Sequence, residues 1–224
     1  MFFNLETTRL FEYLPKIIWP AFLATLKMLF LSMAFGLLIG FLVAIVLVLT
    51  SPDGLSPNKS IYKVTDFIVN MIRSFPVIIL IVAVTPLTKM IIGTSVGWEA
   101  AVVPLTIAAF PIIARLIESA LQEVDQNVIR AAKSFGANKA QILFKVMFVE
   151  ALPQVASGIT FTIIQFLAST TLAGAVGGGG LGAVALTFGY QRFDDVMMYA
   201  IVFILCVMVL IIQNLGTFIY RKLK

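Results

Sequence analysis

The chain has 224 residues, of which 60% are hydrophobic and only 12% carry a charge, and its mean hydropathy is +1.04. Soluble domains carry about 25% charged residues, so this composition is typical of an integral membrane protein. The net charge of +5 does not require a nucleic-acid partner, because membrane proteins have basic cytoplasmic loops. The chain has no His and one Cys, Cys206, which excludes disulfides within it, His-based metal sites and a His general base.

Residues 1–16 are expected to form an amphipathic helix at the membrane surface. They carry too many charges for a signal peptide, and the apolar run that follows is too long for one. The apolar residues that share one helical face are Phe3, Leu10, Phe11 and Leu14, and the charged residues are Glu6, Arg9, Glu12 and Lys16. The transmembrane domain then covers residues 17–224.

Five apolar segments are long enough to cross a bilayer, which takes about 17–25 helical residues. They are Ile17–Leu49, Phe67–Thr88, Ala100–Ile117, Pro153–Val176 and Val196–Tyr220. Both Trp and all five Tyr fall at or near the ends of these segments, as an aromatic belt requires. We therefore predict an all-α integral membrane protein with five transmembrane helices, the second of them kinked at Pro76.

The distribution of Lys and Arg indicates the orientation of the chain. With the N-terminus outside and the C-terminus in the cytoplasm, eleven basic residues lie inside and four outside, in agreement with the positive-inside rule. The inner residues are Lys59, Lys63, Arg73, Arg115, Arg130, Lys133, Lys139, Lys145, Arg221, Lys222 and Lys224. The outer residues are Arg9, Lys16, Lys89 and Arg192.

The polar segment 118–153 is the most informative part of the chain. Its charges exclude a lipid-facing span, because each charge at the bilayer centre costs about 2.5–3.5 kcal/mol or more. These charged residues, which we expect in water, are Glu118, Glu123, Asp125, Arg130, Lys133, Lys139, Lys145 and Glu150. The segment therefore lies in the cytoplasm in this orientation.

The same segment predicts two helices joined by a tight turn. A first helix over Asn127–Phe135 is followed by Gly136, where a left-handed C-cap is expected. Asn138 and Gln141 have the spacing of a capping box at the start of a second helix. That second helix has an apolar stripe made of Ile142, Leu143, Val146 and Met147.

This segment resembles the cytoplasmic loop of permease subunits in bacterial ABC importers. That loop reads Glu-Ala-Ala, three residues, Gly, nine residues, then Ile-x-Leu-Pro. The matching residues are Ala131, Ala132, Gly136, Val146 and Phe148, while Arg130 replaces the Glu and Val149 replaces the Pro. Further stretches resemble the methionine-importer permeases: NMIRSFP at 70–76, TPLTKMIIGTSVG at 85–97, VPLT at 103–106 and GAVGGGGLG at 174–182.

The resemblance implies a multi-pass permease subunit of the bacterial plasma (inner) membrane that imports an amino acid, D- or L-methionine, and that is not itself an enzyme. It implies a permease homodimer, two ATP-binding cassette ATPase subunits, an extracellular or periplasmic substrate-binding protein, and lipid, with no nucleic acid. ATP and Mg²⁺ are expected on the ATPase, and no cofactor on this chain. The residues that the resemblance assigns to coupling, within a coupling region at 118–152, are Val128, Ile129, Arg130, Ala131, Ala132, Lys133, Ser134, Phe135, Gly136 and Ala137.

Two glycine motifs and one charged residue have structural as well as functional interpretations. Gly177–Gly180 lacks the Lys-Ser/Thr of a nucleotide loop, so we interpret it as an unwound outer turn. Gly36 and Gly40 form a small-residue face for helix packing. Arg73, with Ser74 and Pro76, is a candidate for the translocation pathway, although an interfacial anchor explains Arg73 equally well.

Three alternatives remain open from the sequence. The permease could carry another amino acid. A secondary transporter commonly needs acidic or His side chains inside its spans, and the acids here lie at segment ends. A membrane scaffold without transport activity would not need a glycine-hinged pair of cytosolic helices.

Overall fold

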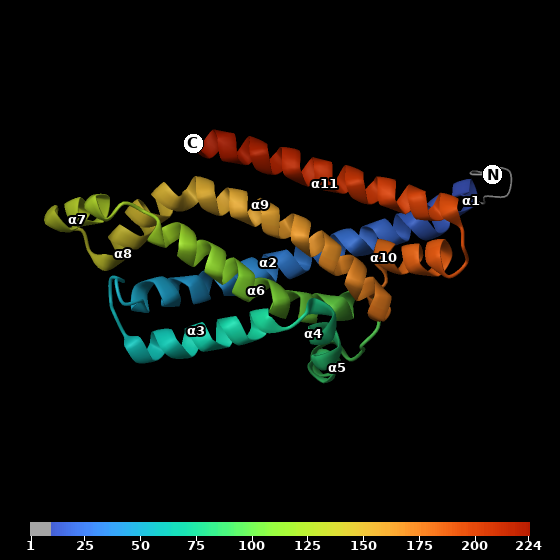
Figure 1. Cartoon of the computed structure of the whole chain (residues 1–224), viewed down its shortest axis with the longest axis horizontal. Helices are drawn as coiled ribbons and strands as arrows, with labels where there is room; N and C mark the ends of the chain where they lie inside the picture. Colours follow the sequence, from blue (N-terminus) through green and yellow to red (C-terminus); the bar gives the residue numbers. More distant parts are fainter. Residues whose placement is uncertain (1–9) are drawn as a thin grey trace.

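The structure is a computed structural model that describes residues 10–224, and all of its regular elements in that range are helical (Figure 1). The α-helices are α1 (Leu10–Tyr13), α2 (Trp19–Thr50), α3 (Lys59–Ser74), α4 (Val77–Ala83), α5 (Thr85–Ile92), α6 (Trp98–Gln122), α7 (Gln126–Ser134), α8 (Lys139–Gln141), α9 (Phe148–Ala173), α10 (Gly180–Val184) and α11 (Asp195–Leu223). Wider π-helical segments are η2 (Leu14–Ile18), η3 (Ile142–Met147), η4 (Gly174–Gly178) and η5 (Ala185–Tyr190).

Four helices are long and apolar enough to cross a membrane, and they span Leu14–Thr50, Trp98–Gln122, Lys139–Gly178 and Asp195–Leu223. A fifth crossing is complete only if α3 and α4 count together as one bent span. The predicted all-helical membrane protein is confirmed, and the predicted number of five spans holds on that condition.

The second span differs from its predicted limits, Phe67–Thr88. It begins earlier, at Lys59, because Asn58 caps α3 by accepting a hydrogen bond from the backbone N–H of Ile61 (3.2 Å). The expected kink at Pro76 is a full break, with α3 and α4 bent by 103°. Proline lacks the N–H that would continue the helix, and it holds the preceding Phe75 in an extended conformation.

The predicted N-terminal helix is only partly described. Residues 1–9, including Phe3, lie outside the described residues. From Leu10 the chain is helical and continues through α1 and η2 into α2. Residues 1–16 as a separate interfacial helix therefore stay a prediction.

The centre of the molecule is the contact between α2 and α6. Gly36 and Gly40 of α2 face α6, where an added Cβ would lie 2.7 Å from the Cβ of Ala109 and 2.7 Å from the backbone oxygen of Phe110, respectively. The small-residue face predicted in α2 thus allows close packing inside one chain. On α6 the buried side chains at this contact include Leu105 and Ile113.

A glycine-rich turn separates α9 from α10, as the sequence predicted. Gly177, Gly179 and Gly180 have positive φ angles of 97°, 74° and 76°, which only glycine adopts freely. Thr25 of α2 holds the turn in place, because its Oγ1 accepts a hydrogen bond from the N–H of Leu181 (2.9 Å). The short helices α10 and η5 that follow were not predicted from the sequence.

The ends of the described chain lie far apart along the longest axis (Figure 1). The C-terminus, α7 and α8 share one end, together with the connection between α2 and α3, while α1 and α10 lie toward the other (Figure 1). Five crossings, the number obtained when α3 and α4 count as one bent span, would place the termini at opposite ends in this way.

Candidate functional site

The site candidate at one end of the molecule is the segment formed by α7, the turn at Phe135–Gly136 and α8. Asp125 starts α7, since its side chain accepts a hydrogen bond from the backbone N–H of Asn127 (2.8 Å). The helix then covers Gln126–Ser134, within one residue of the predicted Asn127–Phe135. The first of the two predicted helices in this segment is therefore confirmed.

The turn after α7 has the hydrogen bonds of a Schellman motif. The N–H of Ala137 bonds the carbonyl of Ala132 (3.1 Å), and the N–H of Gly136 bonds that of Lys133 (3.0 Å). Gly136 itself has a φ of 78°, as predicted for a left-handed C-cap. Two backbone bonds and one glycine thus fix the angle between the two helices.

The second helix begins with the predicted capping box. The backbone N–H of Gln141 donates to Asn138 Oδ1 (2.9 Å), and the N–H of Asn138 donates to Gln141 Oε1 (2.8 Å). The predicted start of the fourth span at Pro153 implied that this second helix ends before the span. It does not. Instead α8, η3 and α9 form one continuous helix, with Pro153 inside it. The turn is therefore attached directly to a membrane helix.

The ten residues predicted for coupling divide into an inner and an outer group. Ile129 is only 3% exposed, and Ala132 and Ala137 also pack against the core. The exposed residues are Val128, Arg130, Ala131, Lys133, Ser134, Phe135 and Gly136. Phe135 is 91% exposed at the tip of the turn, where nothing in the described chain covers it. Aromatic residues are enriched at the centres of protein–protein interfaces, so an exposed Phe at the tip favours a surface that another protein covers.

A partly buried ionic cluster, with the buried Glu118 at its centre, joins α3 to α6 next to this segment. Arg115 donates from Nη1 to Glu118 Oε2 (2.7 Å) and from Nη2 to Asp66 Oδ1. Tyr62 and Gln122 donate to the other oxygen of Glu118 (3.4 and 3.3 Å). Sequence analysis missed this cluster, because its partners on α3 and α6 lie about fifty residues apart.

The position predicted for Glu118 was wrong. We expected it in water at the start of the polar segment, but α6 continues to Gln122 and Glu118 is only 3% exposed. The ionic partner Arg115 and the hydrogen bonds of the cluster explain how a carboxylate can be buried there.

The three residues predicted for the translocation pathway lie together at the break in the second span. Arg73 is exposed in the last turn of α3, and Ser74 Oγ donates to the carbonyl of Asn70 (2.7 Å). Pro76 caps the start of α4. They occupy the point where the span changes direction, and they stay a prediction.

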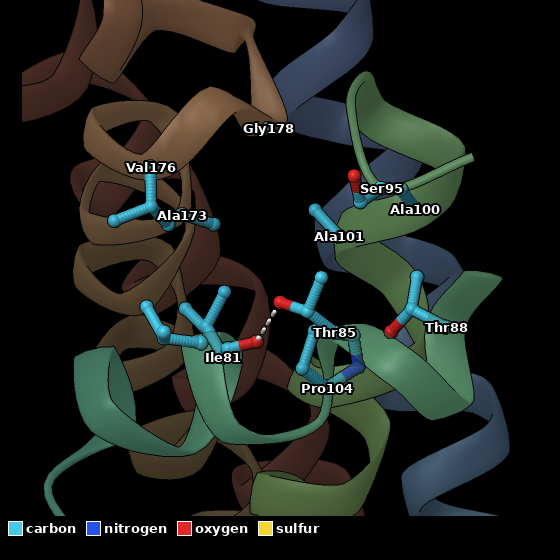
Figure 2. Close-up of a pocket in the computed structure, with 11 residues that line it drawn as sticks. Ile81, Thr85, Thr88, Ser95, Ala100, Ala101, Pro104, Ala173, Val176 and Gly178 are labelled. Carbon is cyan, nitrogen blue, oxygen red and sulfur yellow. Dashed lines mark hydrogen bonds between the residues drawn. The ribbon is translucent and has the colours of Figure 1, made fainter.

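A small cavity lies between α4, α5, α6 and the end of α9, with a volume of about 40 Å³ (Figure 2). Figure 2 shows the hydroxyls of Thr85, Thr88 and Ser95 around it, with Thr85 donating to the carbonyl of Ile81 (3.3 Å). Since one water in the liquid occupies about 30 Å³, this volume is too small for an amino acid. Arg73 does not line it.

The spacing of two of these hydroxyls was visible in the sequence. Thr85 and Thr88 are three residues apart in a short apolar helix, so both fall on the same face. The predicted second span, Phe67–Thr88, ends at these residues, and no function was predicted for them. Among the described residues, no group of three or more His, Cys, Asp or Glu side chains could hold a metal ion.

Comparison with known proteins identifies a family over most of the chain. The model of the "binding-protein-dependent transport system inner membrane component" family matches residues 36–224. The "probable D-methionine transport system permease protein MetI" of Vibrio cholerae is 42% identical over 198 residues, which cover 88% of each chain. The "methionine import system permease protein MetP" of Bacillus subtilis is 47% identical over 174 residues, 77% of this chain and 78% of that protein.

Solved structures have the same fold. A chain of the structure described as "inward facing conformations of the MetNI methionine ABC transporter" is 38% identical and superposes with a TM-score of 0.92, covering 95% of this chain and 99% of that one. A chain of an amino acid ABC transporter is 23% identical with a TM-score of 0.78, and it supports the fold alone. The resemblance inferred from the sequence motifs is confirmed.

Proposed function

Because this chain belongs to the family of binding-protein-dependent transport system inner membrane components, we propose that it is the permease subunit of an ATP-driven methionine importer. The substrate assignment rests on the similarity of this chain to methionine permeases along nearly its whole length. Whether the D- or the L-isomer is carried, or both, is decided by uptake measurements. The chain supplies the membrane path, and ATP hydrolysis takes place on a separate subunit.

The proposed assembly contains two copies of this chain, two ATPase subunits and an external binding protein in a bacterial plasma membrane. We place the N-terminus outside and the C-terminus in the cytoplasm, so that α7, α8 and the C-terminus lie inside. The excess of Lys and Arg at that end supports the orientation. No nucleotide loop occurs in the sequence, so ATP and Mg²⁺ belong to the ATPase.

The coupling mechanism follows from the exposed turn. The outer face of α7 and the side chain of Phe135 dock into a groove of the ATPase, which is helix-in-groove recognition. When ATP binding closes the ATPase pair, each turn moves with its subunit. The buried Ile129 and the partly buried Ala132 and Ala137 transmit that movement to the membrane helices. Transport is thus driven by a coupling free energy between two distant sites.

The translocation pathway runs past the break between α3 and α4. Arg73, Ser74 and Pro76 mark its inner side, and the hydroxyls of Thr85 and Thr88 lie near its outer end. α11 carries no charged residue between Asp195 and Arg221, so the pathway offers few ionic partners for a zwitterion. Weak binding in the pore suits a system whose selectivity lies in the binding protein.

Docking through the exposed turn is tested by a matched pair of Phe→Asp variants. Phe135→Asp places a charge at the docking tip, whereas Phe193→Asp changes a phenylalanine that is 84% exposed in the connection before α11. We expect the ATPase subunit to co-purify with the Phe193→Asp variant and to be lost from the Phe135→Asp variant. Equal recovery of the ATPase with both variants excludes the proposed docking surface.

The transport function is tested by uptake of labelled methionine into liposomes that contain the complete importer. Uptake should require ATP, the ATPase subunit and the binding protein together. Uptake by the permease alone, driven by an ion gradient, supports the secondary transporter instead. ATP-driven uptake of other amino acids but not methionine contradicts the substrate assignment.

A further inference from the structure

A second, larger cavity lies where the coupling turn meets the membrane helices, and its volume is about 420 Å³. It is lined by the end of α2, the loop between α2 and α3, Tyr62 of α3, the end of α6, α7 and η3. Its volume is within the range of about 300–1,000 Å³ that is typical of small-molecule sites. The 40 Å³ cavity in Figure 2 has none of the same lining residues.

The inner wall of this cavity is apolar and rigid. Leu121, Ile129 and Met147 line it and are 1%, 3% and 5% exposed, so they belong to the packed core. The loop that forms the opposite wall is held in place, because Lys139 Nζ donates a hydrogen bond to Ser56 Oγ (2.6 Å). Packed core side chains and a hydrogen-bonded loop therefore define the shape of the cavity.

Two opposite charges line the cavity from different elements. Asp53 comes from the loop between α2 and α3, and Lys133 comes from α7. Within residues 10–224, neither side chain forms an ion pair or a side-chain hydrogen bond, with each other or with any other residue. Both side chains are exposed at the mouth of the cavity. Charges of opposite sign without partners in the described chain, beside an apolar wall, are the features that recognise a zwitterion with an apolar side chain.

We propose that this cavity binds a small neutral amino acid with an apolar side chain. The ammonium group lies at Asp53, the carboxylate at Lys133, and the side chain rests on Leu121, Ile129 and Met147. Gln126 supplies a further polar group at the wall of the site. The binding assignment comes from the chemistry of the cavity, whereas its effect on α7 rests on the proposed function.

A ligand in this position acts on the coupling turn. Lys133 and Ile129 are on α7, whereas Asp53 is on the loop between α2 and α3, so an occupied site ties the two together. The cavity is therefore a control site, separate from the translocation pathway at Arg73. Its occupant changes how firmly α7 is held when the ATPase pulls on it.

The site is tested by cysteine protection in the purified permease–ATPase complex, with Cys206→Ser as background. Gln126→Cys places a thiol in the cavity, and Ser60→Cys places one on an exposed position of α3 outside it. The rate of reaction with a maleimide is measured with and without L-methionine. With a dissociation constant of about 1 mM, about 10 mM ligand fills about nine-tenths of the sites and slows Gln126→Cys about ten-fold. Ser60→Cys should react at an unchanged rate.

Two analogues and two variants test the contacts. Methionine methyl ester lacks the carboxylate, and 4-(methylsulfanyl)butanoate lacks the ammonium group, so neither should protect the thiol. Asp53→Asn and Lys133→Gln should each abolish protection by methionine. Protection that persists in both variants overturns the assignment of the charges.

The remaining outcomes also decide the proposal. A Gln126→Cys thiol that is unreactive in the complex without any ligand means that the ATPase fills the cavity, and the proposal is wrong. Absence of protection by methionine in a complex that still imports it removes the site and leaves the transport function intact. Protection of the Gln126→Cys thiol in a complex that imports no methionine supports the site and contradicts the proposed transport function.

Discussion

Gly136 decides the shape of the coupling turn through its backbone alone. Its φ is 78°, and a Cβ added there would have nothing within 4 Å, so no clash would oppose a larger residue. The cost of a substitution is therefore the left-handed conformation, about 1–2 kcal/mol for a residue other than glycine. A β-branched residue pays most and asparagine least.

The first prediction compares Gly136→Val with Gly136→Asn. We expect the valine variant to lose most of the transport-stimulated ATP hydrolysis, because the turn opens and Phe135 moves from its position. The asparagine variant should retain most of it. The measurement is ATP hydrolysis by the reconstituted complex with binding protein and methionine. Wild-type stimulation in the valine variant contradicts the role assigned to the turn.

Arg115 is the residue that allows Glu118 to be buried. The second prediction is that Arg115→Ala destabilises the chain by about 3–5 kcal/mol, since removing one partner of a buried ion pair leaves the other charge uncompensated. Thermal unfolding in detergent measures the change. Lys145→Ala, which removes an exposed charge without an ion pair in the described chain, is the control and should have little effect. Restoration of stability in the double variant Arg115→Ala with Glu118→Gln identifies the buried charge as the cause.

At this scale the sequence predicted what depends on near neighbours. The positive φ of Gly136 and the capping box of Asn138 and Gln141 are set within a few residues, and both were predicted correctly. The pairing of Arg115 with Asp66 depends on how two separate helices pack, which residue spacing does not reveal. The same limit explains why the cavity at Asp53 and Lys133 was not foreseen.

Among the helices, α2 and α6 depend on two glycines for their close approach. The third prediction is that Gly40→Val destabilises the chain by about 1–3 kcal/mol, because its side chain would overlap α6 at Phe110 and Ile113. Leu38→Val, at a position of the same helix that is 60% exposed, is the matched control. Detergent-solubilised yield and thermal unfolding provide the measurements. Similar yields and unfolding temperatures for the two variants would show that α2 and α6 tolerate a larger separation.

The predicted elements were correct where hydrophobicity is uninterrupted. The long apolar runs of α2, α6 and α11 were located to within a few residues of their observed ends, apart from the C-terminal end of α6, which extends five residues further, to Gln122. Proline predicted a kink at Pro76, but hydropathy carries no information on the angle between helices, so it could not show that α3 and α4 are bent by 103°. It also treats residues 139–152 as a polar connection, although capping and helix periodicity make them the first turns of the fourth span.

For the whole molecule, the orientation is the property that the proposed function most needs. The fourth prediction uses single cysteines in the Cys206→Ser background. Ser60→Cys lies at the end of the molecule that contains α7, and Thr94→Cys lies in the exposed turn after α5 (Figure 1). An impermeant thiol reagent should label Thr94→Cys in intact cells and Ser60→Cys only after permeabilisation. The opposite labelling pattern would place α7 outside and remove its contact with the ATPase.

The long helix that starts at Asn138 has a mechanical consequence. From Lys139 to Ala173 it runs without a break, and at 1.5 Å per residue it is about 50 Å long. A tilt of about 10° around one end displaces the other by about 9 Å over that length. The helical backbone conformation is first lost at Val176 and Gly177, just beyond the end of this helix. In the proposed assembly, a small rotation of the ATPase is thus amplified along this helix and reaches the opposite end of the molecule, where the glycine-rich turn can change its backbone angles.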